Sequence, residues 1–148
     1  MSFTALFLGI ALLSFAQNNI TFHITSQNGK LFQQKEDTYC MNFSISGLNT
    51  DADAETFKTK FTANSMVKQF EILPGNNEQG ERKAQLILKN KDKEPFISLL
   101  KSVNVTTLNV DKKDYSLDQF DQLSKDLKAK NQENSKINEE QRSNKATK

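Results

Sequence analysis

The chain of 148 residues is predicted to form one α+β domain, because strand-like and helix-like segments alternate along it. In the strand-like segments apolar residues alternate with polar ones, and in the helix-like segments they recur every three or four residues. From residue 39 to residue 110 the order is strand, helix, strand, strand, helix, strand. This is the order of the ferredoxin-like βαββαβ sandwich, in which four antiparallel strands carry both helices on one face.

The composition limits the classes of function that the chain could perform. The formal net charge is +2 and Arg82 and Arg142 are the only arginines, so no strongly basic face for nucleic acid is predicted. An apolar content of 36% supports one modest core, and eleven phenylalanines with no tryptophan suggest a core packed with aromatic rings. We therefore expect another protein or a peptide as the partner, and no nucleic acid.

Residues 1–16 are predicted to be a secretory signal peptide. Almost every residue over 3–16 is apolar, which is typical of a signal sequence and too short to span a bilayer. A buried N-terminal strand or helix is the alternative. Cleavage before Gln17 would give an exported protein, periplasmic or secreted, with no integral membrane span in the mature chain. The single cysteine, Cys40, cannot form an intramolecular disulfide, which fits a bacterial exported domain.

Residues 17–38 are predicted to form an N-terminal β-hairpin. Ile20, Phe22 and Ile24 alternate with polar residues, as in a half-buried strand. Asn28 followed by Gly29 is a strong signal for a two-residue turn, and a return strand is expected to begin at residues 31–32. The hairpin could add strands to the edge of the main sheet or cover one of its faces.

Residues 39–114 are predicted to form the main domain. Thr50 is a good N-cap for its first helix, and Asp53 three residues later completes a capping-box-like pair. The first predicted strand has Tyr39, Met41, Phe43 and Ile45 on one face and ends at Gly47, and the helix after it has Ala54, Phe57 and Phe61 on its buried side. Two strands follow, over 66–73 and 83–88, joined by a turn at 74–80. The second helix begins at Pro95 with Phe96, Leu99, Leu100 and Val103 on one face, and the last strand covers 105–110.

A C-terminal helix is predicted over residues 115–130. Ser116 and Gln119 offer a second capping box, and an apolar stripe follows at Leu117, Phe120, Leu123 and Leu127. From residue 128 onward apolar residues are few, and Lys, Asn, Gln, Glu and Ser dominate. Residues 131–148 are therefore expected to be a disordered tail.

Residues 41–110 resemble the heavy-metal-associated (HMA) domain of copper chaperones and metal-transporting ATPases. In that family a strand of pattern F-x-I-x-G-M leads through x-C-x-x-C into a helix, and residues 43–48 match the strand with Leu48 in place of Met. Residues 66–72 are similar to the family's G-V-x-x-V-x-V strand. The resemblance implies a ferredoxin-like fold and a soft-metal site of two thiolates at the start of the first helix.

This chain lacks both of those cysteines, because Thr50 and Asp53 occupy the two positions. A hydroxyl and a carboxylate form no soft-metal site and are residue types that cap a helix. The resemblance therefore implies a degenerate site with no metal cofactor. The alternative is a copper or zinc site made from non-standard ligands, either Cys40, Met41 and His23 or the carboxylates near Asp51 and Asp53.

The motifs favour a binding module over an enzyme. The single histidine, His23, lies in no hydrolase motif, and the chain contains no glycine-rich phosphate loop. The acylphosphatases, which share the split fold, hold phosphate with an arginine at the start of the first helix, and no arginine precedes Arg82. We expect a non-catalytic exported interaction module that meets its partner through the open sheet face, a sheet edge or the tail. The alternative function is metal binding or metal handling by an HMA-like domain with non-standard ligands.

Overall fold

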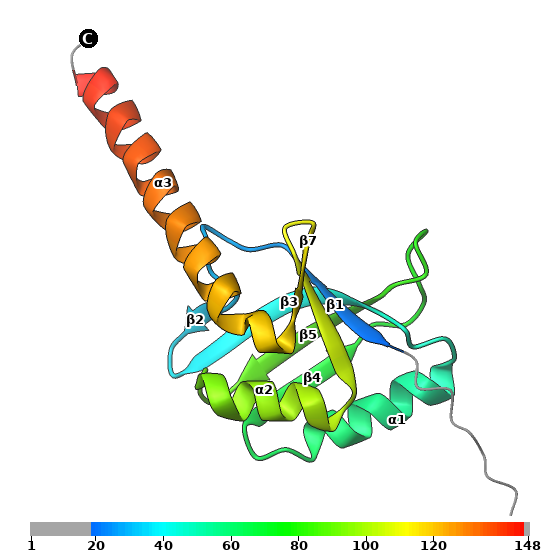
Figure 1. Ribbon diagram of the computed structural model, residues 1–148. Coiled ribbons are helices and arrows are strands. Elements are labelled where there is room, and N and C mark those ends of the chain that lie inside the picture. Colours follow the sequence, from blue (N-terminus) through cyan, green and yellow to red (C-terminus); the bar gives the residue numbers. More distant parts are fainter. Residues whose placement is uncertain (1–18, 147–148) are drawn as a thin grey trace, which may run out of the picture.

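The computed structural model describes residues 19–146 and shows a mixed α+β fold, as predicted (Figure 1). The predicted signal peptide lies outside the described residues. The described elements are strands β1 (Ile20–Ile24), β2 (Gln33–Lys35), β3 (Thr38–Ser46), β4 (Val67–Ile72), β5 (Arg82–Leu88), β6 (Val105–Val110) and β7 (Lys113–Ser116), helices α1 (Asp51–Thr62), α2 (Lys93–Ser102) and α3 (Phe120–Ala146), and the short 3₁₀ turn η1 (Leu117–Gln119).

The strands form one seven-stranded sheet in which β1 occupies a central position. The order is β4-β5-β3-β1-β6-β7, and β2 pairs with one end of β3. β1 is antiparallel to β3 and parallel to β6, so it separates two strands that would be neighbours in the predicted four-stranded sheet. Both expected positions for this segment, at an edge or over a face, are therefore wrong. The reason is its burial, since Ile20, Phe22 and Ile24 all lie in the core.

The predicted N-terminal hairpin is correct only at its turn. Asn28 and Gly29 both have positive φ, and Gln27 and Lys30 form a bridge across them. Beyond this bridge the two arms separate, because β1 and β2 each pair with β3 instead of with each other. The expected return strand is present as β2, but it begins at Gln33 and not at residues 31–32. The Phe32 ring packs edge-to-face on Phe96 of α2, with a centroid distance of 5.2 Å.

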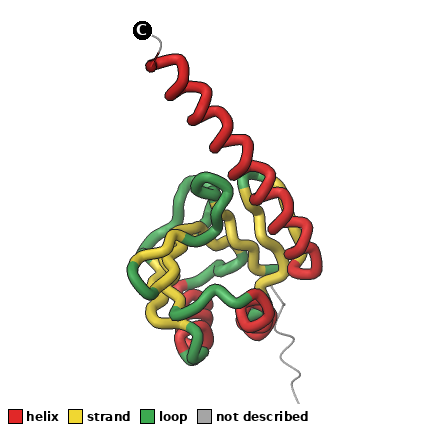
Figure 2. The backbone as a smooth tube through the Cα atoms, turned by 90° about the vertical axis from the view of Figure 1, so that its left-hand side faces the viewer, coloured by secondary structure: helices red, strands yellow, loops and turns green. Residues whose placement is uncertain are grey.

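The core lies between the sheet and helices α1 and α2, which cover the same face (Figures 1 and 2). Its centre is a group of aromatic rings: Phe22 from β1, Phe43 from β3, Phe57 and Phe61 from α1, and Phe70 from β4. The ring centroids of Phe22 and Phe43 are 4.4 Å apart, and those of Phe61 and Phe70 are 4.5 Å apart. Each such buried ring stabilises the fold by roughly 1.5–3 kcal/mol, so the aromatic core expected from the composition is present.

Helix α3 continues to Ala146, well past the expected end at residue 130 (Figure 1). The prediction of a disordered tail is therefore wrong for residues 131–146. The physical reason is intrinsic propensity, because this stretch contains Lys, Glu, Gln and Arg, which are good helix formers even without an apolar face. The second capping box is confirmed, and in it Gln119 Oε1 accepts from the Ser116 backbone N–H at 3.0 Å.

The first half of α3 is fixed to the domain by apolar and polar contacts. Leu123 is fully buried, and the backbone of α3 passes so close to Gly29 that a Cβ there would lie 2.4 Å from the Leu127 carbonyl oxygen. Lys130 Nζ donates to Asp111 Oδ2 at 2.8 Å and to Ser26 Oγ at 3.2 Å. These contacts orient α3 so that its second half projects away from the sheet (Figures 1 and 2).

Strand β7 was not expected from the sequence. It pairs with β6 across a two-residue turn formed by Asp111 and Lys112, which have φ values of 52° and 70°. Turns of this kind usually contain glycine or asparagine, so the sequence carries no hairpin signal here. Hydrogen bonds compensate for the backbone strain at Asp111, because its carboxylate accepts from the backbone N–H of Ser26 at 2.8 Å as well as from Lys130.

Truncation of Phe22 should severely destabilise the protein. We expect Phe22→Ala to lower the free energy of unfolding by about 3–5 kcal/mol, since a central ring would leave a cavity. Phe22→Leu keeps most of the volume and should lose less than about 1.5 kcal/mol. Urea denaturation measures both changes. The matched control is Leu73→Ala, at a side chain that is 53% exposed, with an expected change within about 0.5 kcal/mol.

Protonation of Asp126 at acidic pH should weaken the contact between α3 and β7. Hydrogen bonds from Lys113, Tyr115 and Gln122 lower the pKa of Asp126 from 3.8 to about 2. Since the folded pKa is depressed, this contact stabilises the fold above the ordinary carboxyl pKa and is lost as the pH falls from about 4 to about 2. Amide hydrogen exchange over residues 120–131 should accelerate in that window.

Asp126→Asn should show the faster exchange already at neutral pH, because the charge that holds Lys113 is absent. Asp118→Asn is the control, since the Asp118 carboxylate is 88% exposed and pairs with Lys101 at the longer distance of 3.4 Å. Equal exchange in the wild-type protein and Asp126→Asn at neutral pH would contradict this role of Asp126.

Candidate functional site

The predicted helix cap is present in the loop before α1, at the two positions where the sequence resemblance implied a degenerate metal site. Thr50 Oγ1 accepts a hydrogen bond from the Asp53 backbone N–H at 3.0 Å, and Asp53 Oδ2 accepts one from the Thr50 N–H at 3.0 Å. Both polar side chains are thus used by a reciprocal capping box at the start of α1. Ahead of it, Gly47 has a φ of 96°, and a Cβ there would lie 2.5 Å from the Asn19 carbonyl oxygen.

A buried arginine holds the same loop, and sequence reasoning missed it. Arg82 on β5 is 5% exposed; its Nε donates to the Leu48 carbonyl oxygen at 3.1 Å, and its Nη1 donates to Asp51 Oδ1 at 2.8 Å. The structure therefore places Arg82 at the start of α1, although Arg82 comes after that helix in the sequence. Asp51 already pairs with its charge, so the loop does not present a free guanidinium to an anion.

The alternative metal ligands Cys40, Met41 and His23 do not meet. Met41 is in the core at 2% exposure, whereas Cys40 and His23 project from the opposite side of the sheet. His23 lies beside Ser44, four residues along β3 from Cys40, which corresponds to about 13 Å at roughly 3.3 Å per residue. Within residues 19–146 no group of three or more His, Cys, Asp or Glu side chains is arranged to hold a metal ion.

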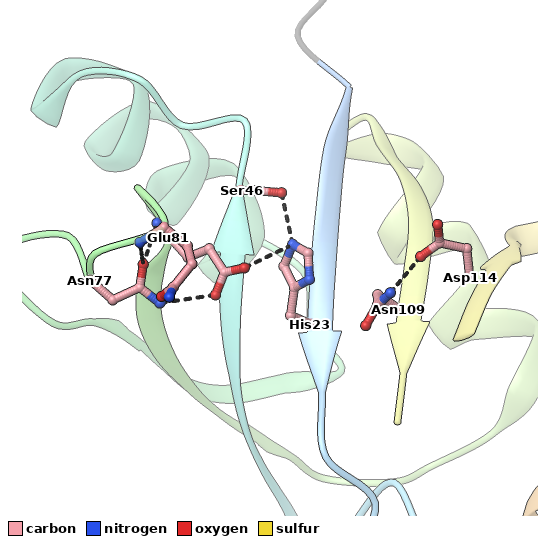
Figure 3. Close-up of polar contacts among 7 residues, drawn as sticks. His23, Ser46, Asn77, Glu81, Asn109 and Asp114 are labelled. Atoms are coloured by element: carbon pink, nitrogen blue, oxygen red, sulfur yellow. Dashed lines mark hydrogen bonds and ion pairs between the residues drawn. The ribbon is translucent and has the colours of Figure 1, made fainter. Parts of the chain in front are cut away.

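The sheet face opposite α1 and α2 carries a polar cluster centred on His23 (Figure 3). The imidazole Nε2 lies 2.9 Å from Ser46 Oγ on β3 and 3.5 Å from Glu81 Oε1 in the loop before β5. The side chains of His23 and Glu81 are 31% and 19% exposed, so solvent reaches both. β1 therefore presents Phe22 to the core and His23, the next residue, to the other face.

Glu81 is held in place by Asn77 within a tightly bonded loop (Figure 3). The Asn77 side-chain oxygen accepts from the backbone N–H groups of Gln79 at 3.0 Å and Glu81 at 2.8 Å. Its amide nitrogen donates to Glu81 Oε2 at 3.0 Å, which leaves Oε1 directed at His23. The sequence predicted a turn over 74–80, but nothing in it indicated that this turn delivers a carboxylate to the sheet face.

Ser46, His23 and Glu81 are the residue types of a hydrolytic triad, but their arrangement is different. In a triad the serine and the carboxylate bond opposite nitrogens of the imidazole, so that the ring can transfer a proton between them. Here both oxygens contact the same nitrogen, Nε2. The cluster is thus suited to hydrogen bonding and to fixing the ring, and not to proton transfer from Ser46.

Two adjoining shallow hollows, of about 490 Å³ and 400 Å³, meet at His23. The first extends over β3 and β5 to the exposed Leu73, with Asn42 and Gln85 bonded to each other at 3.0 Å on its floor. The second extends toward β6, where Asn109 Nδ2 donates to Asp114 on β7 at 2.6 Å (Figure 3). The face therefore offers polar groups whose positions are fixed, beside a smaller amount of apolar surface.

Comparisons with known proteins find no relative. No family model, no curated protein and no solved structure matches the chain. Among the described helices, none is both long and apolar enough to cross a membrane.

Loss of Arg82 should destabilise the loop more than loss of its exposed partner. Arg82→Ala removes a buried side chain with two hydrogen bonds and should lower the free energy of unfolding by about 1–3 kcal/mol. Asp51→Ala should lower it by less than about 1 kcal/mol, because the Asp51 carboxylate is 95% exposed and its pair is screened by solvent. Thermal or urea unfolding measures both changes. If the two variants lost the same free energy of unfolding, the ion pair, and not the buried contacts of Arg82, would account for the stabilisation.

Proposed function

We propose that the protein is a non-catalytic exported binding module that meets another protein or peptide through the sheet face around His23. One observation carries the proposal: helices cover a single face of the central sheet, while the opposite face presents the fixed cluster of His23, Ser46 and Glu81 between two hollows. Its side chains come from separate elements, so the fold itself positions them. The proposed export rests on the apolar stretch over residues 3–16.

The composition of this face favours a macromolecular partner. Leu73 is a large apolar side chain, 53% exposed, at the rim of the first hollow, where Lys83 and Gln85 add polar groups. Protein interfaces combine apolar anchors with a polar rim that is partly hydrated. The hollows are shallow and open, whereas a small molecule usually needs a concave pocket that surrounds most of its surface.

We further propose that residues 39–114 are a ferredoxin-like unit of HMA type that has lost its metal site and received β1 as an inserted strand. The order of the elements from β3 to β6 supports this, as does the position of Thr50 and Asp53 at the start of α1. In this proposal the two thiolates were replaced by a capping box and by the contacts of Arg82, so that the loop stabilises the fold instead of binding metal.

Photocrosslinking from defined positions tests the binding face. A photoreactive residue replacing Gln85, on the open face, should crosslink one specific partner in an extract of the producing cells. The same residue replacing Glu55, exposed on α1, should not. Leu73→Ala and His23→Ala should reduce crosslinking from position 85 severalfold while leaving the fold intact. Equal crosslinking from both positions, or no loss in either variant, would contradict the proposal.

Titration with Cu(I) under reducing conditions tests the proposed loss of the metal site. The native chain should show no localised chemical-shift changes, whereas the Thr50→Cys/Asp53→Cys double variant should bind one Cu(I) with shifts confined to residues 47–54. Tight binding by the native chain that disappears in Cys40→Ala would contradict the first expectation. A double variant that folds but binds no copper would contradict the relation to HMA domains.

A further inference from the structure

A third hollow, of about 450 Å³, separates the middle of α3 from the segment 27–34. It lies on a different surface from the His23 cluster and shares no lining residue with either hollow there. Its ten lining residues include seven Asn and Gln side chains, no acidic side chain and one cation, Lys30.

The α3 wall of the groove is a stripe of small polar residues. Asn131, Asn134, Ser135 and Asn138 follow one another at the spacing i, i+3, i+4 and i+7, which places them on one face of the helix. Asparagine is a much poorer helix former than alanine or glutamine. Within the described residues the carboxamides of Asn131, Asn134 and Asn138 make no side-chain hydrogen bond. The helix therefore carries three unfavourable residues whose donors and acceptors remain available to a ligand.

The opposite wall supplies an aromatic ring and further carboxamides. Phe32 is half-buried and held from behind by the edge-to-face contact with Phe96. Beside it, the Gln33 amide donates to the Gln27 side-chain oxygen. The groove thus combines a partly exposed ring with amide groups on two sides.

Contacts at one end of the groove hold its two walls together without a ligand. At one end Gly29 meets the helix backbone, where a Cβ would lie 2.8 Å from the Asn131 nitrogen. Lys130 adds its bonds to Asp111 and Ser26. A site formed in advance loses less conformational entropy when it binds.

We propose that this groove binds a neutral oligosaccharide. Carboxamides present a donor and an acceptor side by side, which matches sugar hydroxyl groups, since these also donate and accept. The apolar face of a sugar ring can pack on Phe32, and the absence of acidic side chains with a single lysine fits a ligand without charge. A peptide added as a strand fits less well, because β2 offers an edge of only three residues.

Titration of the full-length protein with neutral hexasaccharides of glucose, mannose and N-acetylglucosamine tests this proposal. In amide-resolved NMR spectra, at least one should shift the side-chain NH₂ signals of Asn131, Asn134 and Asn138 and the backbone of residues 32–34. The Asn134→Ala/Asn138→Ala variant should bind that sugar at least about tenfold more weakly, since each lost hydrogen bond contributes a factor of several. Alanine is the better helix former, so this variant should keep α3 folded.

Gln132→Ala is the matched control, because Gln132 is exposed on the same helix and does not line the groove. It should leave the affinity unchanged. The proposal is overturned if none of the neutral sugars binds, if Gln132→Ala weakens binding as much as the double variant, or if only a heparin-derived hexasaccharide binds and does so through Lys30. Binding of an extended peptide in place of every sugar would overturn it as well.

Discussion

The insertion of β1 between β3 and β6 is the constraint on which the rest of the structure depends. Through β1 the sheet joins two parts, β4, β5 and β3 on one side and β6 and β7 on the other, which have no direct strand pairing. The same strand completes the aromatic core with Phe22 and places His23 at the centre of the uncovered face. β1 pairs in parallel with β6, which is far from it in sequence, so forming this contact costs loop-closure entropy. The burial of side chains from both strands has to offset that cost.

The loop before α1 has a structural role. Three of its polar side chains already have intramolecular partners: Thr50 and Asp53 bond each other, and Asp51 bonds Arg82. The close approach of Gly47 to Asn19 ties this loop to the start of β1. The loop thus fixes the first helix and the central strand relative to each other.

Asp111 connects the two surfaces to which we assign binding. It lines the second hollow of the open face, and its carboxylate also accepts from Ser26 and from Lys130 on α3. These bonds hold α3 beside the segment that forms the opposite wall of the amide-lined groove. The turn at Asp111 and Lys112 therefore has a structural role that explains why a strained backbone without glycine is kept there.

The local structural features could be predicted from the sequence by itself. Both capping boxes, the turn at Asn28 and Gly29 and the apolar faces of α1 and α2 follow from interactions within a few residues, and all are present. Only the tertiary structure decided which strands pair, since the alternation of Ile20, Phe22 and Ile24 is the same for a central strand and an edge strand. The contacts of Arg82 with the loop before α1 and of Glu81 with His23 were also decided by the tertiary structure alone, because they depend on how segments distant in sequence pack together.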